Sequence, residues 1–213
     1  MNELLNREII LQINADCYMK MTAERPVQDL CLCDCADLIV HHPQVDNLCI
    51  KPWSSIKTIF DILTTMRFCF EAALEGKLKL IPLPCNIGYI NCEYVHLGRK
   101  DYLPYHELIN RYLLMDSPRF TATWLYEIDG SFFIEVTPLY PWAFCDPQPG
   151  EQYISYEEFM ASYKSMLTIP LQCADIERLY QKTSQLADEM LARERKQSGF
   201  DITHYIVHEE AKS

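Results

Sequence analysis

The chain has 213 residues, of which 49% are hydrophobic and 12% aromatic, a globular composition that excludes disordered, collagen-like and disulfide-knot proteins. Its formal net charge of −11 argues against nucleic acid and anionic membranes as partners, because an acidic surface repels both. The six glycines are too scattered for a GxGxxG fingerprint, a P-loop or a GxSxG nucleophile elbow, which excludes those nucleotide-binding and hydrolase motifs.

The first half of the chain predicts two helices with strands between them. Apolar residues at every fourth position predict a helix over 3–22, which ends before Pro26. Alternating leucines then predict one or two strands over 29–40. A second apolar stripe predicts a helix over 55–75, with Gly76 as its C-terminal stop.

The middle of the chain gives weaker patterns. The segment 77–96 resembles a strand broken by two prolines. Pro104 is suited to the first turn of a short helix that reaches about Met115.

A β-hairpin over 119–138 is the clearest local prediction, with its turn at Asp129-Gly130. A two-residue loop would pair Tyr126 with Phe133, and a three-residue loop would pair Tyr126 with Phe132. We favour the three-residue loop, because it makes one face of the hairpin uniformly apolar.

Two helices follow the hairpin. Ser155 is a good N-cap for a helix whose apolar face extends to Leu167, and Pro170 interrupts the pattern. A last helix is predicted over 174–196. Together these elements predict a single α+β domain over 1–200, with amphipathic helices on a small, mainly antiparallel sheet, and a loosely attached tail over 201–213.

The excess negative charge lies in two windows that contain no lysine or arginine. Residues 28–50 hold four acids and residues 120–163 hold seven, and these eleven equal the net charge of −11. The second window also holds aromatic residues, which are common at binding hot spots. We therefore expect a surface for a basic protein partner, formed by Glu127, Asp129, Phe133, Glu135, Tyr140, Trp142 and Asp146. The alternative is that these acids only keep the protein soluble.

The ten cysteines are expected to be free thiols of a cytoplasmic protein, because Met1–Glu8 lacks the pattern of a secretory signal. No apolar run is long enough to cross a membrane. Cys31, Cys33 and Cys35 are candidate metal ligands, but alternate residues of a strand are about 6.5–7 Å apart, too far for one ion to hold all three unless the segment bends. His204 and His208 have helical spacing without the glutamate of an HExxH motif. We expect no metal and no cofactor.

An enzyme remains an alternative, with a site assembled from Cys92, His96 and His106, although nothing in their spacing requires such a pair. A subunit of a larger assembly is a third possibility. No enzyme motif is present in the sequence.

A resemblance favours the binding role. The stretches Trp124–Glu127, Asp129-Gly130, Phe133–Trp142 and Ile154–Phe159 resemble uncharacterised bacterial cytosolic proteins, some of which are immunity proteins of polymorphic toxin systems. This resemblance implies a non-enzymatic inhibitor or immunity-type protein that occludes its partner. It implies no catalytic residue.

Overall fold

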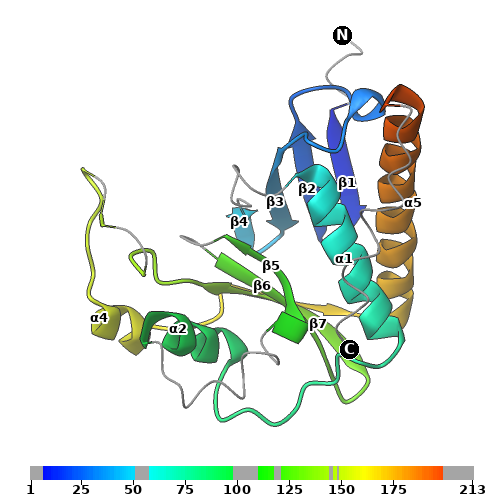
Figure 1. The fold of residues 1–213 in the computed structure, drawn as a ribbon. Helices are drawn as coiled ribbons and strands as arrows, with labels where there is room; N and C mark the ends of the chain where they lie inside the picture. The colour runs from blue at the N-terminus through cyan, green and yellow to red at the C-terminus, as the bar shows by residue number, and fades with distance from the viewer. Residues whose placement is uncertain are drawn as a thin grey trace.

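The computed structural model describes residues 7–50, 58–97, 110–117, 121–143, 146–147 and 149–198, and these form an α+β fold (Figure 1). Two four-stranded antiparallel sheets have the strand orders β1-β2-β3-β4 and β5-β6-β7-β8. The first sheet comprises β1 Glu8–Gln12, β2 Tyr18–Ala23, β3 Ala36–His42 and β4 Val45–Ile50. The second comprises β5 Leu113–Ser117, β6 Thr121–Ile128, β7 Ser131–Pro138 and β8 Leu167–Leu171. The helices are α1 Ile59–Leu74, α2 Ile87–Leu97, α4 Tyr156–Ala161 and α5 Cys173–Ser198, with a 3-10 turn η2 at Val27–Asp29.

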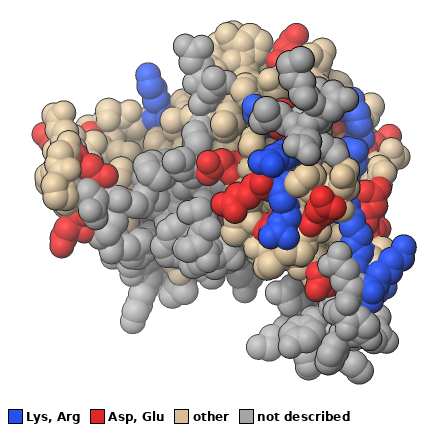
Figure 2. Space-filling model, turned by 90° about the horizontal axis from the view of Figure 1, so that it is seen from above, with Lys and Arg blue, Asp and Glu red and all other residues tan. Residues whose placement is uncertain are grey.

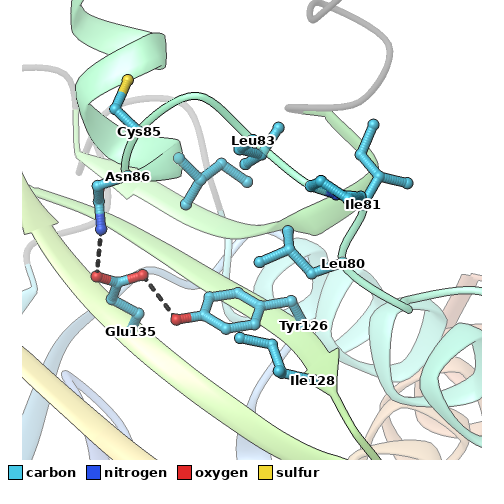
Figure 3. A pocket seen from close by; sticks show the side chains of 10 residues that line it. Leu80, Ile81, Leu83, Cys85, Asn86, Tyr126, Ile128 and Glu135 are labelled. Carbon is cyan, nitrogen blue, oxygen red and sulfur yellow. Dashed lines mark hydrogen bonds between the residues drawn. The ribbon is translucent and has the colours of Figure 1, made fainter.

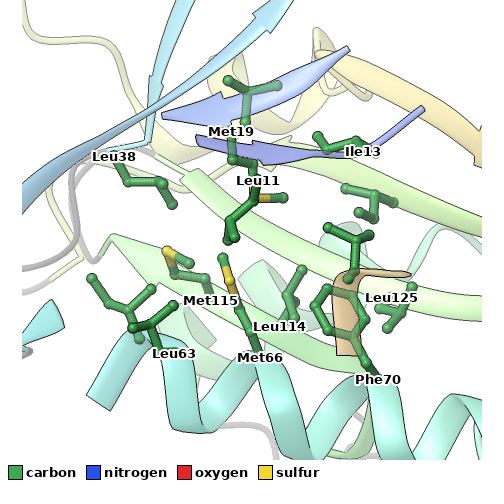
Figure 4. Close-up of a cluster of buried hydrophobic side chains, with 14 of the residues drawn as sticks. Leu11, Ile13, Met19, Leu38, Leu63, Met66, Phe70, Leu114, Met115 and Leu125 are labelled. Atoms are coloured by element: carbon green, nitrogen blue, oxygen red, sulfur yellow. The ribbon is translucent and has the colours of Figure 1, made fainter. Parts of the chain in front are cut away.

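One hydrophobic core joins the two sheets to the long helices. Leu11 and Met19 of the first sheet lie opposite Met66 of α1 and Leu114 of β5, and all four are buried (Figure 4). Helix α1 also packs along α5 (Figure 1). The predicted α+β class is confirmed, and a second, smaller cluster of buried side chains comprises Cys92, Tyr140, Tyr156 and Phe159. The predicted tail over 201–213 lies outside the described residues.

The predicted N-terminal helix over 3–22 is wrong. Residues Glu8–Ala23 form the hairpin β1–β2, in which Ile9 pairs with Met21 and Leu11 with Met19. Apolar residues at every fourth position also fit a strand. Every second side chain of a strand lies on the same face, so every fourth one does too. The turn is stabilised by Asn14, whose side-chain oxygen accepts the backbone N–H groups of Asp16 and Cys17.

The second predicted helix is confirmed as α1, and its start is sharply defined. Thr58 accepts the backbone N–H of Asp61 at 3.1 Å, while the Asp61 carboxylate accepts the backbone N–H of Thr58 at 2.9 Å. This reciprocal capping box satisfies two backbone donors that a helix N-terminus otherwise leaves free. The strands predicted over 29–40 are confirmed only in part. Residues 36–40 belong to β3.

Of two predictions in the middle of the chain, one is wrong and the other is partly confirmed. The expected strand over 77–96 contributes one bridge, Lys79 to Glu127, before the chain turns into α2. The Asn86 side-chain oxygen accepts the backbone N–H of Gly88 at 2.8 Å, which helps to start that helix. Of the helix expected from Pro104 to about Met115, residues 104–109 lie outside the described residues, residues 110–112 are helical, and residues 113–115 belong to strand β5.

The hairpin over 119–138 is confirmed as β6–β7, but the preferred register is wrong. Ile128 pairs with Ser131 and Tyr126 with Phe133, so the loop has two residues. Asp129 and Gly130 both have positive φ, 50° and 81°, as the favoured two-residue turn requires. The three-residue loop is favoured only where one face of the hairpin is exposed, whereas both faces of these strands are largely buried.

The C-terminal predictions are partly confirmed. Ser155 caps α4 as expected, but that helix ends at Ala161, and Leu167 lies in strand β8 instead of on its face. Pro170 is accommodated in β8 because this strand is at the edge of its sheet. The last helix is confirmed as α5.

Candidate functional site

Glu135 is not a surface residue, which corrects its predicted role in partner binding. Its side chain is 4% exposed and its carboxylate accepts hydrogen bonds from Tyr126 Oη at 2.8 Å and Asn86 Nδ2 at 2.6 Å (Figure 3). The Ser165 hydroxyl also donates to this carboxylate. Among the described residues, no lysine or arginine pairs with it. Glu135 therefore joins three segments by hydrogen bonds, because Asn86 precedes α2 and Ser165 precedes β8.

The Glu135 carboxylate lies at the polar side of a pocket of about 330 Å³ (Figure 3). Aliphatic side chains of the segment 80–87 and of Ile128 line the rest of the pocket. Burial and the neighbouring Glu135 raise the pKa of Tyr126, so its phenol stays protonated as a donor. The pocket is mainly apolar, with its polar groups engaged in hydrogen bonds to one another.

The tip of the hairpin does not form the single-sign surface that the sequence predicted. Asp129 is exposed and Glu127 is half-buried, but the parallel bridge places exposed Lys79 beside Glu127. Two backbone hydrogen bonds of 2.8 Å form this bridge: the Glu127 N–H donates to the Leu78 carbonyl oxygen, and the Leu80 N–H donates to the Glu127 carbonyl oxygen. A basic residue distant in sequence thus offsets the acids of this face.

Two of the predicted aromatic anchors belong mainly to the interior. Phe133 is half-buried and stacks on Tyr126 with ring centroids 5.9 Å apart. Tyr140 is buried among Tyr156 and Phe159 of α4, with centroid distances of 5.4 and 5.5 Å. Neither ring is available as a fully exposed anchor.

Trp142 remains a surface candidate, and the structure adds Tyr153 beside it. The two rings lie 5.3 Å apart, Trp142 is half-buried, and Tyr153 is 57% exposed. The indole Nε1 of Trp142 is buried, with no hydrogen-bond partner among the described residues. The part of Trp142 that a partner could contact is therefore its exposed ring area and not its Nε1 atom.

Exposed acids adjoin this aromatic pair along the chain. Asp146 and Glu151 belong to the loop between Trp142 and Tyr153, and Glu157 belongs to α4. Burial raises the pKa of Tyr140 to about 12, and hydrogen bonding to Tyr153 and the charge of Glu157 add to the effect. Figure 2 shows carboxylates next to uncharged residues at the end of the molecule where α4 lies. We name this region the α4-end surface and define it by Trp142, Asp146, Glu151, Tyr153 and Glu157.

The α4-end surface retains Trp142 and Asp146 from the prediction and adds three residues that it missed. Tyr153, Glu151 and Glu157 share the window 120–163, in which the sequence holds no lysine or arginine. That absence of bases is the signal that would have identified them. Figure 1 places α4 far from the tip of the β6–β7 hairpin, so the predicted residues do not form one site.

The environment of Cys92 does not support the alternative of a Cys–His catalytic site. Cys92 is buried, its thiol donates to Pro138 O at 3.7 Å, and burial raises its pKa to about 11. A protonated, inaccessible thiol is a poor nucleophile. The His96 side chain and His106 lie outside the described residues.

The segment that holds the three clustered cysteines bends, contrary to the predicted strand. Residues 31–35 form a turn, not a strand, and the Sγ atoms of Cys31 and Cys33 are 2.9 Å apart. Within the described part of the chain, however, no group of three or more histidine, cysteine or acidic side chains is arranged to hold a metal ion. His204 and His208 are not among the described residues.

Comparison with other proteins adds no relative. No protein-family model, curated protein or solved structure matches this chain. Among the described residues, no helix combines the length and hydrophobicity of a transmembrane segment.

Proposed function

We propose that this chain is a non-enzymatic, cytoplasmic binding protein of the inhibitor or immunity type, which covers a basic protein partner with its α4-end surface. The observation that carries the proposal is the pair of half-buried Trp142 and exposed Tyr153, in a stretch that holds carboxylates but no lysine or arginine. The resemblance of the hairpin region to bacterial immunity proteins agrees with this role. Arginine and lysine side chains of a partner suit both features, because they pair with carboxylates and stack on aromatic faces.

The proposed mechanism is occlusion in two stages. The carboxylates of Asp146, Glu151 and Glu157 attract a basic partner and accelerate its encounter. Trp142 and Tyr153 then lose their remaining exposed area against the partner. No covalent chemistry is required.

A matched pair of photo-crosslinking variants tests this proposal in the source cells. Tyr153 and Phe68 are both aromatic and similarly exposed, at 57% and 59%, but Phe68 lies on α1. A photoreactive phenylalanine analogue is placed at one position or the other, and adducts are identified by mass spectrometry. We expect a basic protein to be captured from position 153 and not from position 68.

Two other outcomes would contradict the proposal. Capture of the same partner from position 68 alone would place the interface on the opposite part of the molecule. Capture of another copy of this chain, or of acidic subunits only, from position 153 would instead favour a subunit of a larger assembly.

A further inference from the structure

The turn that precedes β3 brings two thiols together. The Cys31 and Cys33 Sγ atoms lie 2.9 Å apart, so one thiol donates to the other. Cys33 is exposed and Cys31 is half-buried, which leaves the pair open to solvent from the Cys33 side. The neighbouring apolar residues are directed inward, since Leu30 is buried and Leu32 packs against the core.

Asp34 fixes the backbone of this turn. Its carboxylate accepts the Cys31 backbone N–H at 2.7 Å, and its own N–H donates to Cys31 O at 3.2 Å. Arg25 Nε pairs with the other carboxylate oxygen at 3.1 Å. The Asp34 carbonyl accepts the backbone N–H of Ile59, the first residue of α1, at 2.8 Å. The two sulfurs are thus held together by a turn that is attached to a helix.

We propose that Cys31 and Cys33 are a site of reversible oxidation, which reacts with a small-molecule disulfide of the glutathione class to form an intramolecular disulfide. This inference is independent of the proposed partner surface, since the two sites lie on different elements. Cys35 is excluded from the pair, because its Sγ contacts the Cys33 carbonyl oxygen at 3.9 Å and not a sulfur atom.

The reaction has two balanced steps. The Cys33 thiolate attacks one sulfur of the small disulfide, which forms a mixed disulfide and releases one small thiolate. Cys31 then loses its proton to solvent and attacks the Cys33 sulfur, which releases the second small thiolate and closes the Cys31–Cys33 bond. The protein thiols are oxidised by two electrons, and the small disulfide is reduced to two thiols.

The order of the two steps follows from the environments of the thiols. The hydrogen bond with Cys33 is the main cause that raises the pKa of Cys31 to about 11, with burial second. Cys31 therefore holds its proton at neutral pH and is suited to the resolving step. Cys33, on the exposed side, is the attacking sulfur.

The experiment uses the purified full chain, reduced and then incubated with oxidised glutathione. Free thiols are alkylated, and the protein is cut before aspartate without reduction. Cleavage before Asp29, Asp34 and Asp37 yields residues 29–33, with Cys31 and Cys33 alone, and separates Cys35 onto residues 34–36. We expect the 29–33 peptide to lose two hydrogens and to carry no alkyl group, while Cys35 is alkylated.

Three single variants distinguish the roles. Cys31→Ser is expected to accumulate a stable mixed disulfide at Cys33, because the resolving thiol is absent. Cys33→Ser is expected to lose the reaction at this turn, and Cys35→Ser to behave as wild type. Thermal unfolding of each variant by circular dichroism checks that the fold is retained.

An arsenical supplies a second readout that involves no oxidation. Phenylarsine oxide condenses with two neighbouring thiols and releases one water, so its retention requires both Cys31 and Cys33 but not Cys35. A wild-type 29–33 peptide that keeps two alkylated thiols, or bears a lasting mixed disulfide, would overturn the proposal. Loss of the reaction in Cys35→Ser would also overturn it, by assigning the disulfide to another pair.

Discussion

Glu135 offers the most quantitative test of the fold, since its carboxylate is buried and held by three neutral donors. Tyr126→Phe removes one donor, and Glu135→Gln replaces one of the carboxylate oxygens with an amide group. The Tyr126 hydroxyl is 2.8 Å from Glu135 Oε2, and Asn86 Nδ2 is 2.6 Å from Oε1. These lengths are those of strong, charge-assisted hydrogen bonds.

The magnitudes follow from these contacts. Loss of one hydrogen bond to a charged acceptor costs about 1.5–3 kcal/mol, so we expect Tyr126→Phe to lower the free energy of unfolding by that amount. Glu135→Gln is expected to cost about 2–4 kcal/mol, because the new amide faces a donor. In the double variant, the two effects should fall short of additivity by about 1–2 kcal/mol, as expected for residues in direct contact.

Urea unfolding followed by tryptophan fluorescence measures all four proteins. Trp124 is fully buried beside this network and donates to Thr137 Oγ1 at 2.8 Å, so it reports loss of the local packing. Additive effects, or a Tyr126→Phe variant as stable as wild type, would refute the claim that Glu135 joins these segments through the Tyr126 hydroxyl.

Three further predictions concern other parts of the fold. Gly88→Ala should lower the unfolding free energy by about 1–3 kcal/mol in urea, because its new Cβ would lie 2.7 Å from Thr137 Cβ; an unchanged midpoint would contradict that close packing. Thr58→Ala should cost about 1 kcal/mol by the same assay, since the Asp61 N–H loses its cap, and equal stability would show that the cap is unimportant. Burial raises the pKa of Cys92 from its ordinary 9.0 to about 11, so the unfolded thiol ionises first and stability falls by about 2 kcal/mol from pH 9 to 11. Cys92→Ala should remove that part of the pH dependence, and an unchanged slope would be inconsistent with a buried, neutral thiol.

The N-terminal error shows a limit of periodicity as a signal. Ile9, Ile13, Cys17 and Met21 recur at every fourth position, and a strand and a helix both place such residues on one face. Leu11 and Met19 between them are the residues that indicate a strand, because both are apolar and both are buried. Helices α1 and α5 were predictable, because their apolar residues also recur at three-residue intervals.

The hairpin register was not decidable from the hairpin alone. Burial of Glu135 is tolerated because Asn86 and Ser165 donate to it, and these residues are 49 and 30 positions away in the sequence. The same limit affects the candidate site, where Lys79 offsets Glu127 across a bridge between distant segments. The acidic window itself is visible in the sequence, but which of its residues are exposed depends on the tertiary fold.

The proximity of Cys31 and Cys33 was likewise not predicted, because this segment was expected to be a strand. Alternating leucines predicted an extended segment, in which alternate side chains are about 7 Å apart. The turn closed by Asp34 brings the sulfurs to 2.9 Å instead. Asp34, three residues after Cys31, is the signal that could have suggested this turn, because aspartate side chains often accept nearby backbone N–H groups in turns.

The central claim is that acids of the α4-end surface attract a basic partner, and the salt dependence of the association rate tests it most directly. The rate is measured for the partner captured from position 153, with wild type and two charge-matched triple variants. The test variant changes Asp146, Glu151 and Glu157 to lysine, and the control variant changes the exposed acids Asp16, Asp37 and Glu177. Each replaces three negative charges with three positive ones, a change of six that takes the net charge from −11 to −5.

We expect wild type and the control variant to associate rapidly at low salt and progressively more slowly as ionic strength rises. The test variant should associate slowly at every salt concentration, with the salt dependence lost or reversed. Equal rates and equal salt dependence in the two triple variants would contradict the account, because only the net charge of the protein, and not the α4-end surface, would then govern the encounter.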